Sequence, residues 1–475
     1  MARPEFDIVV IGGGSGGLVV AAGGRALGAK VALVERHRLG GDCLWTGCVP
    51  SKALLRSARA AHEMREAARW ALVPADPRPD LARVMERVRA VIAAIEPHDS
   101  PERFRGLGVD VIFGDGRFVS PTAFAVGGRT LTARTFVIAT GSRPAIPPVP
   151  GLDAVPCLTN ESLFELREGV PHLAVIGGGP IGVEMAQAFR RLGSDVTLVE
   201  MGPALLPKED RDVAAVVAAQ LAREGVAVHC DTSVTHIAGR AGALALELRT
   251  QGTTHTLNAT HVLVAAGRAL NVDTLGLDAA GVRVEHGRPV LDDRLRTTQR
   301  HIFAIGDAAG GYQFTHVAEH QAGVVLRHAI FRMAWAKPSA VVPWCTYTDP
   351  ELARVGISEA EAVARGVDHR VYHFPFADID RAQADGETEG FAKLVTDAKG
   401  RLLGAAIVGP HAGELIAEYG LALAKGMTAA DVSGAIHAYP TLASISRRVA
   451  DQRQKERLTP NARRWIQRLF RLQGD

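Results

Sequence analysis

The stretch Gly40–Lys52 reads Gly-Gly-Asp-Cys-Leu-Trp-Thr-Gly-Cys-Val-Pro-Ser-Lys and places two cysteines, Cys43 and Cys48, five positions apart. Five residues of regular α-helix rise about 7.5 Å, whereas a disulfide needs its two Cα atoms within roughly 7 Å. A disulfide between them therefore requires irregular backbone around Cys43, and the three glycines of the stretch supply that freedom. Pro50 indicates a first helical turn that places Cys48 at a helix N-terminus, where the helix dipole favours a thiolate.

The cysteine pair favours a dithiol/disulfide redox centre, because one low-pKa thiol beside a second is suited to disulfide exchange. Two alternatives are inert buried cysteines and half of a metal site, although metal sites usually bring closer pairs and further ligands. The sequence has five cysteines, an odd number that does not suit an extracellular disulfide framework. The others, expected to be buried thiols, are Cys157, Cys230 and Cys345.

Composition narrows the class of protein. The chain has 475 residues, of which 47% are hydrophobic and 22% are charged, as is typical of two to four globular domains. A net charge of +3 gives no indication of a nucleic-acid partner. The sequence shows no apolar run long enough to span a membrane and no N-terminal signal segment. We therefore expect a cytoplasmic protein.

The N-terminal segment carries a dinucleotide fingerprint. An apolar strand over Asp7–Ile11 leads into the pattern G-x-G-x-x-G, and a helix of small residues and a strand over Val31–Glu35 follow. The glycines of the pattern are Gly12, Gly14 and Gly17. Such glycines let a pyrophosphate approach the helix N-terminus, and the acid that ends the second strand, Glu35, suits a ribose hydroxyl.

The fingerprint occurs a second time. A strand over His172–Ile176 leads into the second pattern, and the next strand ends at Glu200. The glycines of this copy are Gly177, Gly179 and Gly182. In both copies the first glycine and the acid are 23 positions apart, so the sequence predicts two bound dinucleotides. A carboxylate at Glu200 accepts hydrogen bonds from a 2′-hydroxyl and repels a 2′-phosphate, which favours NADH over NADPH.

Together these motifs resemble the pyridine nucleotide-disulfide oxidoreductases, which include dihydrolipoamide dehydrogenases, glutathione reductases and mercuric reductases. The resemblance extends along nearly the whole chain and implies bound FAD at the first fingerprint, a nicotinamide donor at the second, and a homodimer. It implies that Cys48 faces the flavin and that Cys43 exchanges with the acceptor. Lys52 and Glu184 would pair near the flavin N5, and Tyr439 of the partner subunit would line the acceptor side.

Three further cofactor contacts are implied by the resemblance. A strand ending in Ala-Thr-Gly would place Thr140 and Gly141 against FAD. Another strand ends in Gly-Asp, and its Asp307 would hold the ribityl or phosphate portion of FAD; the alternative is an ordinary turn aspartate. Gly267 follows a strand over Val262–Ala266. The segment at Gly267 resembles the place where the chain of family members returns from the nicotinamide domain to the FAD domain.

We expect an α/β fold with two Rossmann-like dinucleotide-binding domains and a C-terminal α+β dimerisation domain. The FAD-binding domain would comprise residues 1–147 and 271–340, with the NAD(P)-binding domain at 148–270 inserted between them. Residues 341–457 would form the dimerisation domain, an antiparallel sheet with helices on one face, and 458–475 a C-terminal tail. In the FAD-binding domain, helices are expected over 18–27, 53–70 and 81–95.

The sequence departs from the family pattern within Ile436–Ser444. In dihydrolipoamide dehydrogenases and glutathione reductases a histidine precedes the Pro-Thr pair, and a glutamate five positions later orients it as the acid–base group. Here those positions hold Tyr439 and Ser444. A phenol, with an ordinary pKa near 10, is a poor base at neutral pH. His437 is two residues earlier, and an extended segment would put it on the same face as Tyr439. It is therefore a candidate substitute base, although a structural role for His437 is favoured.

The missing base favours a metal ion, or another acceptor that needs no strong base, as in the mercuric reductase branch. Mercuric reductases also use a tyrosine in this region, but their C-terminal vicinal cysteine pair is absent here. One alternative is a dihydrolipoamide dehydrogenase with an altered base, whose acceptor would be a small disulfide. Another is a flavin-binding redox sensor with little turnover.

Residues 458–475 predict a basic amphipathic helix. Its apolar residues fall on one face, and they are Trp465, Ile466, Leu469, Phe470 and Leu472. Its basic residues gather to one side, and they are Arg464, Arg468 and Arg471. Such a helix can make a peripheral contact with an anionic membrane. A terminal helix packed on its own dimer is the alternative, and it is the preferred expectation.

Overall fold

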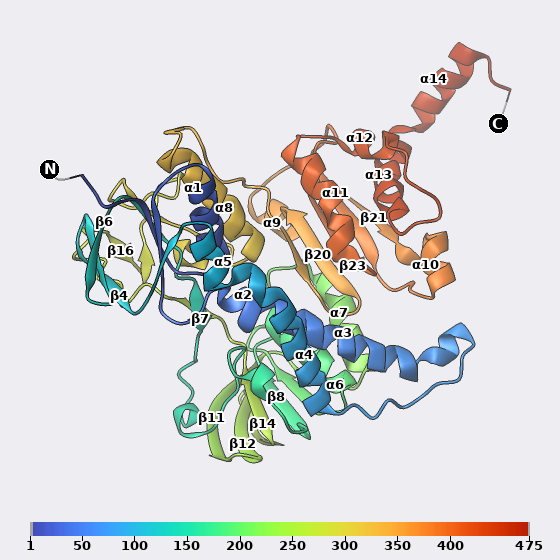
Figure 1. Ribbon diagram of the computed structural model, residues 1–475. Coiled ribbons are helices and arrows are strands. Elements are labelled where there is room, and N and C mark those ends of the chain that lie inside the picture. The colour runs from blue at the N-terminus through green and yellow to red at the C-terminus, as the bar shows by residue number, and fades with distance from the viewer. Residues whose placement is uncertain (1–2, 474–475) are drawn as a thin grey trace.

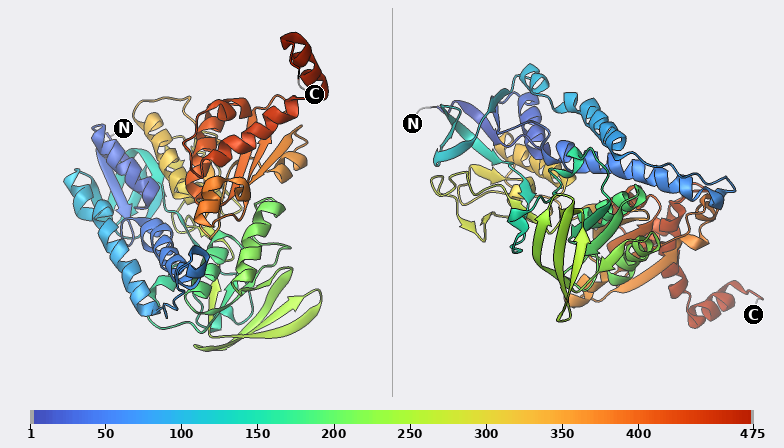
Figure 2. Two further views of the ribbon diagram at one scale, coloured as in Figure 1. Left: turned by 90° about the vertical axis from the view of Figure 1, so that its right-hand side faces the viewer. Right: turned by 90° about the horizontal axis from the view of Figure 1, so that it is seen from below.

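In a computed structural model, which describes residues 3–473, the chain forms three α/β bodies arranged around the long helix α3 (Cys48–Arg65) (Figure 1). Figure 2 shows the same bodies from two further sides. Residues 1–2 of the expected first domain and 474–475 of the expected tail lie outside the described residues. Every helix within residues 3–473 is too short or too polar to cross a membrane.

The first body has a parallel sheet in the order β3-β2-β1-β6, with β18 added beside β6. These strands are β1 (Phe6–Ile11), β2 (Val31–Glu35), β3 (Asp110–Phe113), β6 (Arg129–Ile138) and β18 (Ile302–Ala304). The N-terminal part of β6 also pairs with an antiparallel hairpin of β4 (Gly116–Ser120) and β5 (Ala123–Val126). Helix α1 (Ser15–Ala26) packs against α8 (Thr315–Ala329). A strand and a helix from after residue 300 thus complete the body that the N-terminus begins.

The second body repeats this plan with a parallel sheet in the order β10-β9-β8-β14. Its strands are β8 (His172–Ile176), β9 (Asp195–Val199), β10 (Ala227–His229) and β14 (His261–Val264). Its helices are α6 (Pro180–Arg191) and α7 (Arg211–Arg223), and an antiparallel meander follows with β11 (Thr232–Arg240), β12 (Ala243–Thr250) and β13 (Thr253–Ala259). The chain passes from the first body to the second through β7 (Ser142–Pro144) and returns through β15 (Arg268–Leu270). These two strands pair with each other antiparallel.

The third body is a five-stranded antiparallel sheet in the order β19-β20-β23-β22-β21, with helices packed on it, as the sequence predicts. Its strands are β19 (Pro343–Thr346), β20 (Glu351–Gly356), β21 (Arg370–Pro375), β22 (Phe391–Thr396) and β23 (Leu402–Gly409). Its larger helices are α11 (Ala412–Ala424) and α13 (Ser444–Arg457). Strands β20 and β23 also contact α7 of the second body, which joins the two bodies.

The remaining helices and strands complete the fold. Their bounds are α2 (Gly41–Trp45), α4 (Leu81–Ile95), α5 (Pro101–Gly106), β16 (Val284–Glu285), β17 (Arg288–Pro289), α9 (Glu359–Ala364), α10 (Asp380–Asp385), α12 (Ala429–Gly434) and α14 (Pro460–Phe470). Some sequence-based boundaries were wrong. The helix expected over 53–70 begins at Cys48 and ends at Arg65, because a separate 3₁₀ turn takes over at Ala67. The strand expected over 262–266 stops at Val264, before the turn at Gly267.

One hydrophobic core fixes α3 on the second body. Leu54 of α3 is buried in the same cluster as Val183 and Phe189 of α6 and Met85 of α4. Helices α3 and α6 therefore lie side by side in direct contact. This contact holds α3, whose first residue is Cys48, against the second body.

Candidate active site

The cysteine pair spans a break between two helices, as its spacing predicts. Cys43 lies in the short helix α2, and Cys48 is the first residue of α3. Gly47 makes the break, since a Cβ there would lie 2.9 Å from the Asp42 carbonyl oxygen and only glycine fits. Both cysteines are free thiols in the structure. The pair is therefore described in its reduced form.

The two thiols titrate in opposite directions. A hydrogen bond from Cys43 is the main cause that lowers the pKa of Cys48, to about 6, with help from Thr315 and the charge of Lys52. The Cys48 sulfur lies 3.5 Å from the Thr315 hydroxyl. The same bond to Cys48, together with burial, raises the pKa of Cys43. The reduced pair thus holds one thiolate on Cys48 and one proton on Cys43 at neutral pH.

Lys52 and Glu184 form the ion pair that the resemblance implies. The Lys52 Nζ lies 3.0 Å from Glu184 Oε2, and Glu184 is buried in α6. The other oxygen of Glu184 accepts a hydrogen bond from the Tyr347 backbone N–H at 2.9 Å, and the Lys52 ammonium lies 4.3 Å from the centre of the Tyr347 ring. Both ends of the pair are therefore held in place, one helical turn along α3 from Cys48.

We expect the Cys48 thiolate to depend on Cys43. In the reduced protein, alkylation of Cys48 should rise with pH and level off above about pH 7, because its pKa is lowered to about 6. In Cys43→Ala the thiolate loses its main hydrogen-bond donor, so the pKa should rise and alkylation at pH 6.5 should slow. Iodoacetamide rates against pH measure this, with Cys157→Ala as the control. An unchanged rate profile in Cys43→Ala would contradict the assignment.

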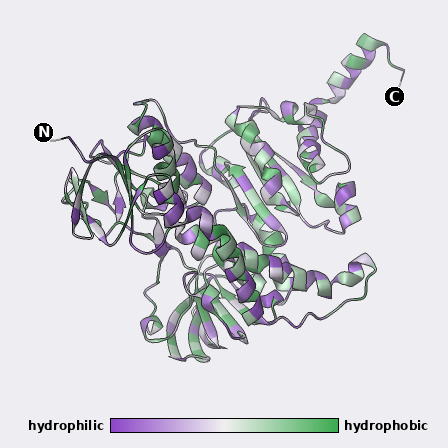
Figure 3. Ribbon diagram, in the orientation of Figure 1, coloured by the Kyte–Doolittle hydropathy of each residue, from purple (hydrophilic) through white to green (hydrophobic). Residues whose placement is uncertain are grey.

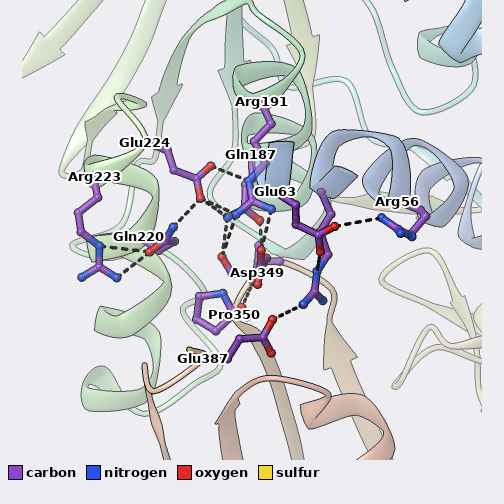
Figure 4. A network of polar contacts seen from close by, with 12 residues as sticks. Arg56, Glu63, Gln187, Arg191, Gln220, Arg223, Glu224, Asp349, Pro350 and Glu387 are labelled. Atoms are coloured by element: carbon purple, nitrogen blue, oxygen red, sulfur yellow. Dashed lines mark hydrogen bonds and ion pairs between the residues drawn. The ribbon is translucent and has the colours of Figure 1, made fainter. Parts of the chain in front are cut away.

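Further along α6, a network of polar contacts surrounds Arg191 (Figure 4). Three residues share one face of α6 because they are three and four positions apart: Glu184, Gln187 and Arg191. Arg191 makes a bidentate pair with Glu224 at 2.7 and 2.8 Å and reaches Asp349 at 2.8 Å. Burial alone would raise the pKa of Asp349, but the charge of Arg191 holds it below its usual range. This network ties α6 to the loop that precedes β20.

Replacing Arg191 with methionine should destabilise the protein by about 3–5 kcal/mol, because it leaves the buried Glu224 carboxylate and the half-buried Asp349 carboxylate without their cation. The side chain of Arg191 is buried, and so is that of Glu224. Urea unfolding of the two proteins measures the difference. Arg223→Met is the matched control, since Arg223 is half exposed and bonds only Gln220 and Glu389; it should change stability by less than about 0.5 kcal/mol. Equal losses would show that burial does not matter here.

The first fingerprint fits a dinucleotide. A Cβ at Gly17 would lie 1.9 Å from the Gly12 carbonyl oxygen, so glycine is required for the helix to pack on the turn. At Gly14 a Cβ would have no atom closer than 3.8 Å, which leaves room for a ligand. The Glu35 carboxylate stands at the end of β2 and accepts a hydrogen bond from the Gly13 N–H at 2.7 Å. This is the arrangement that binds pyrophosphate and ribose.

The second fingerprint has the same geometry. A Cβ at Gly182 would lie 1.9 Å from the Gly177 carbonyl oxygen, and a Cβ at Gly179 would meet nothing within 4 Å. Glu200 accepts a hydrogen bond from the Gly178 N–H at 2.6 Å, as Glu35 does from Gly13. The two sites thus coincide in detail although their sequences differ around the glycines.

The remaining predicted cofactor residues gather where the first two bodies meet. Thr140 and Gly141 follow β6, and the buried Thr140 hydroxyl has no partner within the described chain. Asp307 follows β18, is bonded to Ser142, and has its pKa raised mainly by burial. Gly267 precedes Arg268, whose guanidinium lies 3.1 Å from Asp42 in the cysteine stretch. An unpaired hydroxyl and a buried carboxyl beside an open glycine turn fit a bound FAD.

The residues at the missing-base positions have different partners. Tyr439 is 77% exposed, and its hydroxyl donates a hydrogen bond to Asp380 at 3.1 Å. That bond raises the pKa of Tyr439, so the phenol stays protonated at neutral pH. Ser444 only bonds the Thr441 carbonyl. His437 pairs with Glu418 at 2.9 Å, so different partners hold His437 and Tyr439.

A pocket of about 300 Å³ opens beside Cys43. Its wall includes Cys43 and Leu44 of α2, Ser15 of α1 and Thr315 of α8, and charged groups stand at Arg103 and Glu319. A molecule that enters this pocket comes next to Cys43. The pocket therefore gives Cys43 the access that an exchange thiol needs.

Sequence reasoning missed Thr315, Arg191 and Asp380. Each acts through a contact between residues far apart in the chain, such as the 267 positions between Cys48 and Thr315. The sequence did contain a signal for Arg191: it lies seven positions after Glu184, so the two residues share one face of the same helix. No comparable pattern marks Asp380, whose partner Tyr439 lies in a loop.

Comparisons with known proteins agree with this geometry. Residues 6–322 match the family model "Pyridine nucleotide-disulphide oxidoreductase", and 342–449 match its dimerisation domain. A dihydrolipoyl dehydrogenase of Bacillus subtilis (strain 168) is 33% identical over 454 residues, covering 92% of this chain and 96% of the relative. A mercuric reductase of Bacillus cereus is 34% identical over 441 residues, covering 92% and 70%.

Solved structures show the same likeness. The HOCl-induced flavoprotein disulfide reductase RclA from Escherichia coli is 29% identical with a TM-score of 0.83, and the match covers 94% of this chain and 99% of that one. A Cu(II) complex of RclA matches equally well, at 28% identity and a TM-score of 0.83, with the same coverage.

Proposed function

The chain belongs to the pyridine nucleotide-disulphide oxidoreductases, and from that premise we propose that it passes electrons from NADH to a thiophilic metal ion through the Cys43–Cys48 pair. Members of the family are enzymes that use FAD and NAD(P)H. FAD, when bound, accepts a hydride from the nicotinamide and reduces the disulfide. The protein's own residues then decide which acceptor can take the electrons from the dithiol.

The observation that carries the proposal is the proton on Cys43. The pKa of this thiol is raised, chiefly by its bond to Cys48, so attack on a small disulfide needs a base to remove the proton. Tyr439 is itself protonated and donates to Asp380. A thiophilic metal ion needs no such base, because metal binding displaces the thiol proton directly.

The proposed step balances. The reduced pair, one thiolate and one thiol, gives up two electrons and one proton and forms the S–S bond. Two Cu(II) ions take one electron each, or one Hg(II) ion takes both. The described residues contain no group of three or more His, Cys, Asp or Glu side chains that could hold a metal ion. The acceptor ion is thus expected to meet the two sulfurs themselves.

Among the relatives, mercuric reductases are named for a metal substrate and RclA has been solved with Cu(II), which supports a metal acceptor. Dihydrolipoyl dehydrogenases match equally well, so a dehydrogenase with an altered base is the second candidate. A redox sensor with little turnover is the third. The cytoplasm, where NADH is available, is the compartment in which we expect the reaction.

Anaerobic NADH oxidation by the holoenzyme with Cu(II), Hg(II) and oxidised lipoamide as acceptors tests the proposal. We expect steady turnover with at least one metal ion and turnover with lipoamide lower by about 10²-fold or more, because the base is missing. Faster turnover with lipoamide than with either metal would support the dehydrogenase instead. Absence of turnover with all three acceptors would support the sensor.

We also propose a homodimer, because residues 342–449 match a dimerisation domain. Tyr439 and Asp380 lie on the surface of this domain, and both are exposed. In the dimer, Tyr439 of the partner subunit would face the pocket beside Cys43. The acceptor would then be enclosed between a thiol and a phenol that does not act as a base.

A preference for NADH over NADPH is expected from Glu200. Its carboxylate is fixed at the end of β9 by the N–H groups of Gly178 and Gly202, each at 2.6 Å, where it meets a 2′-hydroxyl but repels a 2′-phosphate. The ratio of kcat/KM for the two donors measures the preference. In Glu200→Gln the repulsion is lost, so the ratio should shift toward NADPH. Equal use of both donors by the unmodified protein would show that Glu200 does not set the choice.

A further inference from the structure

The C-terminal helix α14 stands away from the three bodies. It begins after Thr459, whose side chain accepts a hydrogen bond from the Ala462 N–H, and Pro460 occupies its first position. Figures 1 and 2 show it projecting beyond the third body in every view. None of its residues is buried. The helix is therefore formed by its own caps and not by packing against the described chain.

An apolar face on α14 is left open to solvent. Trp465 is 64% exposed and Phe470 is 65% exposed, and Leu469 and Leu472 are each 55% exposed. Trp465 and Leu469 are four positions apart and share one side of α14, Phe470 ends the helix, and Leu472 follows it. Figure 3 shows hydrophobic and hydrophilic residues both present on the helix. Large aromatic groups are costly to keep in water, so such a face marks a docking surface.

The chain in and around α14 is strongly basic. Between Arg457 and Gln473 the sequence has five arginines and no acidic residue. Arg463, Arg464 and Arg468 lie in α14, whereas Arg457 ends α13 and Arg471 follows α14. An amphipathic helix with Trp, Phe and Leu on one face and arginines on the other is complementary to an anionic lipid surface, where the apolar face enters the acyl boundary and the cations meet headgroups.

We propose that α14 binds the protein to the surface of an anionic membrane. The match to the dimerisation domain ends at residue 449, so α14 lies outside the matched segment. Pairing with the same helix of a second copy would bring two clusters of arginines together, which is unfavourable. The charge therefore favours a lipid surface over a second copy. This inference is independent of the acceptor proposed above.

Co-sedimentation of the holoenzyme with vesicles tests the inference. Vesicles of phosphatidylcholine with about 30% anionic phosphatidylglycerol should bind the protein, because a negative surface attracts the arginines. Pure phosphatidylcholine vesicles should not bind it. In Arg464→Gln with Arg468→Gln, binding should weaken about fivefold for each arginine removed. Binding should also weaken as salt rises from 0.1 M to 1 M, since the Debye length falls from about 10 Å to about 3 Å.

Two double variants distinguish binding through α14 from nonspecific binding of exposed apolar side chains. Trp465→Ser with Phe470→Ser should lose vesicle binding, whereas Leu72→Ser with Val73→Ser, which removes an equally exposed apolar pair from a distant loop, should keep it. NADH oxidation in solution should be unchanged in both. Full binding by the Trp465 and Phe470 variant would overturn the inference. So would a change from dimer to monomer in that variant, because it would show that α14 packs on a second copy.

Discussion

Replacing either cysteine of the pair with serine should reduce NADH-driven metal reduction to the rate measured without enzyme. The electrons leave the protein when the S–S bond forms, and a hydroxyl cannot form it. The loss should not be additive, since the two sulfurs act as a unit: Cys43→Ser, Cys48→Ser and the double variant should share one residual rate. Steady-state NADH oxidation with Cu(II) measures all three, and Cys157→Ser should keep the parent rate.

The two single variants should still differ in one respect. The long-wavelength thiolate–flavin absorbance of the reduced holoenzyme should disappear in Cys48→Ser, because the pKa of Cys48 is the one that is lowered. It should persist in Cys43→Ser, because a serine hydroxyl can still donate a hydrogen bond to the Cys48 thiolate. At pH 7 a thiol with a pKa of about 6 is roughly 90% thiolate, whereas one with an ordinary pKa of about 8.5 is roughly 3% thiolate. The reverse pattern of absorbance would exchange the roles assigned to the two cysteines.

Local sequence patterns were enough to predict most of the fold. The two fingerprints each fix a strand, a turn and a helix within about 25 residues, because glycine contacts and the terminal acid belong to one continuous segment. The structure reproduces them with equal hydrogen bonds at Glu35 and Glu200. Boundaries were less accurate, as at Arg65, because the end of a helix depends on a few weak backbone contacts that leave no pattern in the sequence.

Contacts between distant residues of the site were predicted only where a known family supplied the pairing. Lys52 and Glu184 are 132 positions apart, so no spacing rule joins them, and the resemblance did. At the position of Tyr439 other members of the family have a histidine, so the resemblance gave no partner for the tyrosine. The hydrogen bond from Tyr439 to Asp380 became visible only in the structure. The same holds for Glu418, which pairs with His437. These contacts depend on how loops pack, which local propensity does not encode.

The missing base gives the other large expected effect. Tyr439→His combined with Ser444→Glu should raise lipoamide-dependent turnover by about 10²–10⁴-fold, which is the usual contribution of general acid–base catalysis. The imidazole would take the proton that Cys43 holds, and the glutamate would orient the imidazole. Each single variant should gain much less, because the two side chains act as a unit. Turnover with Cu(II) should stay close to that of the parent, since metal binding displaces the thiol proton without a base.

His437→Ala is the control for this experiment. His437 is held by Glu418 at 2.9 Å and does not accompany Tyr439, so its removal should leave lipoamide turnover at the low level of the parent. If the unmodified protein instead oxidised dihydrolipoamide briskly and His437→Ala abolished that activity, His437 would be the base. The loop 435–443 would then have to rearrange in the dimer, and the metal ion would lose its advantage over a disulfide as the proposed acceptor.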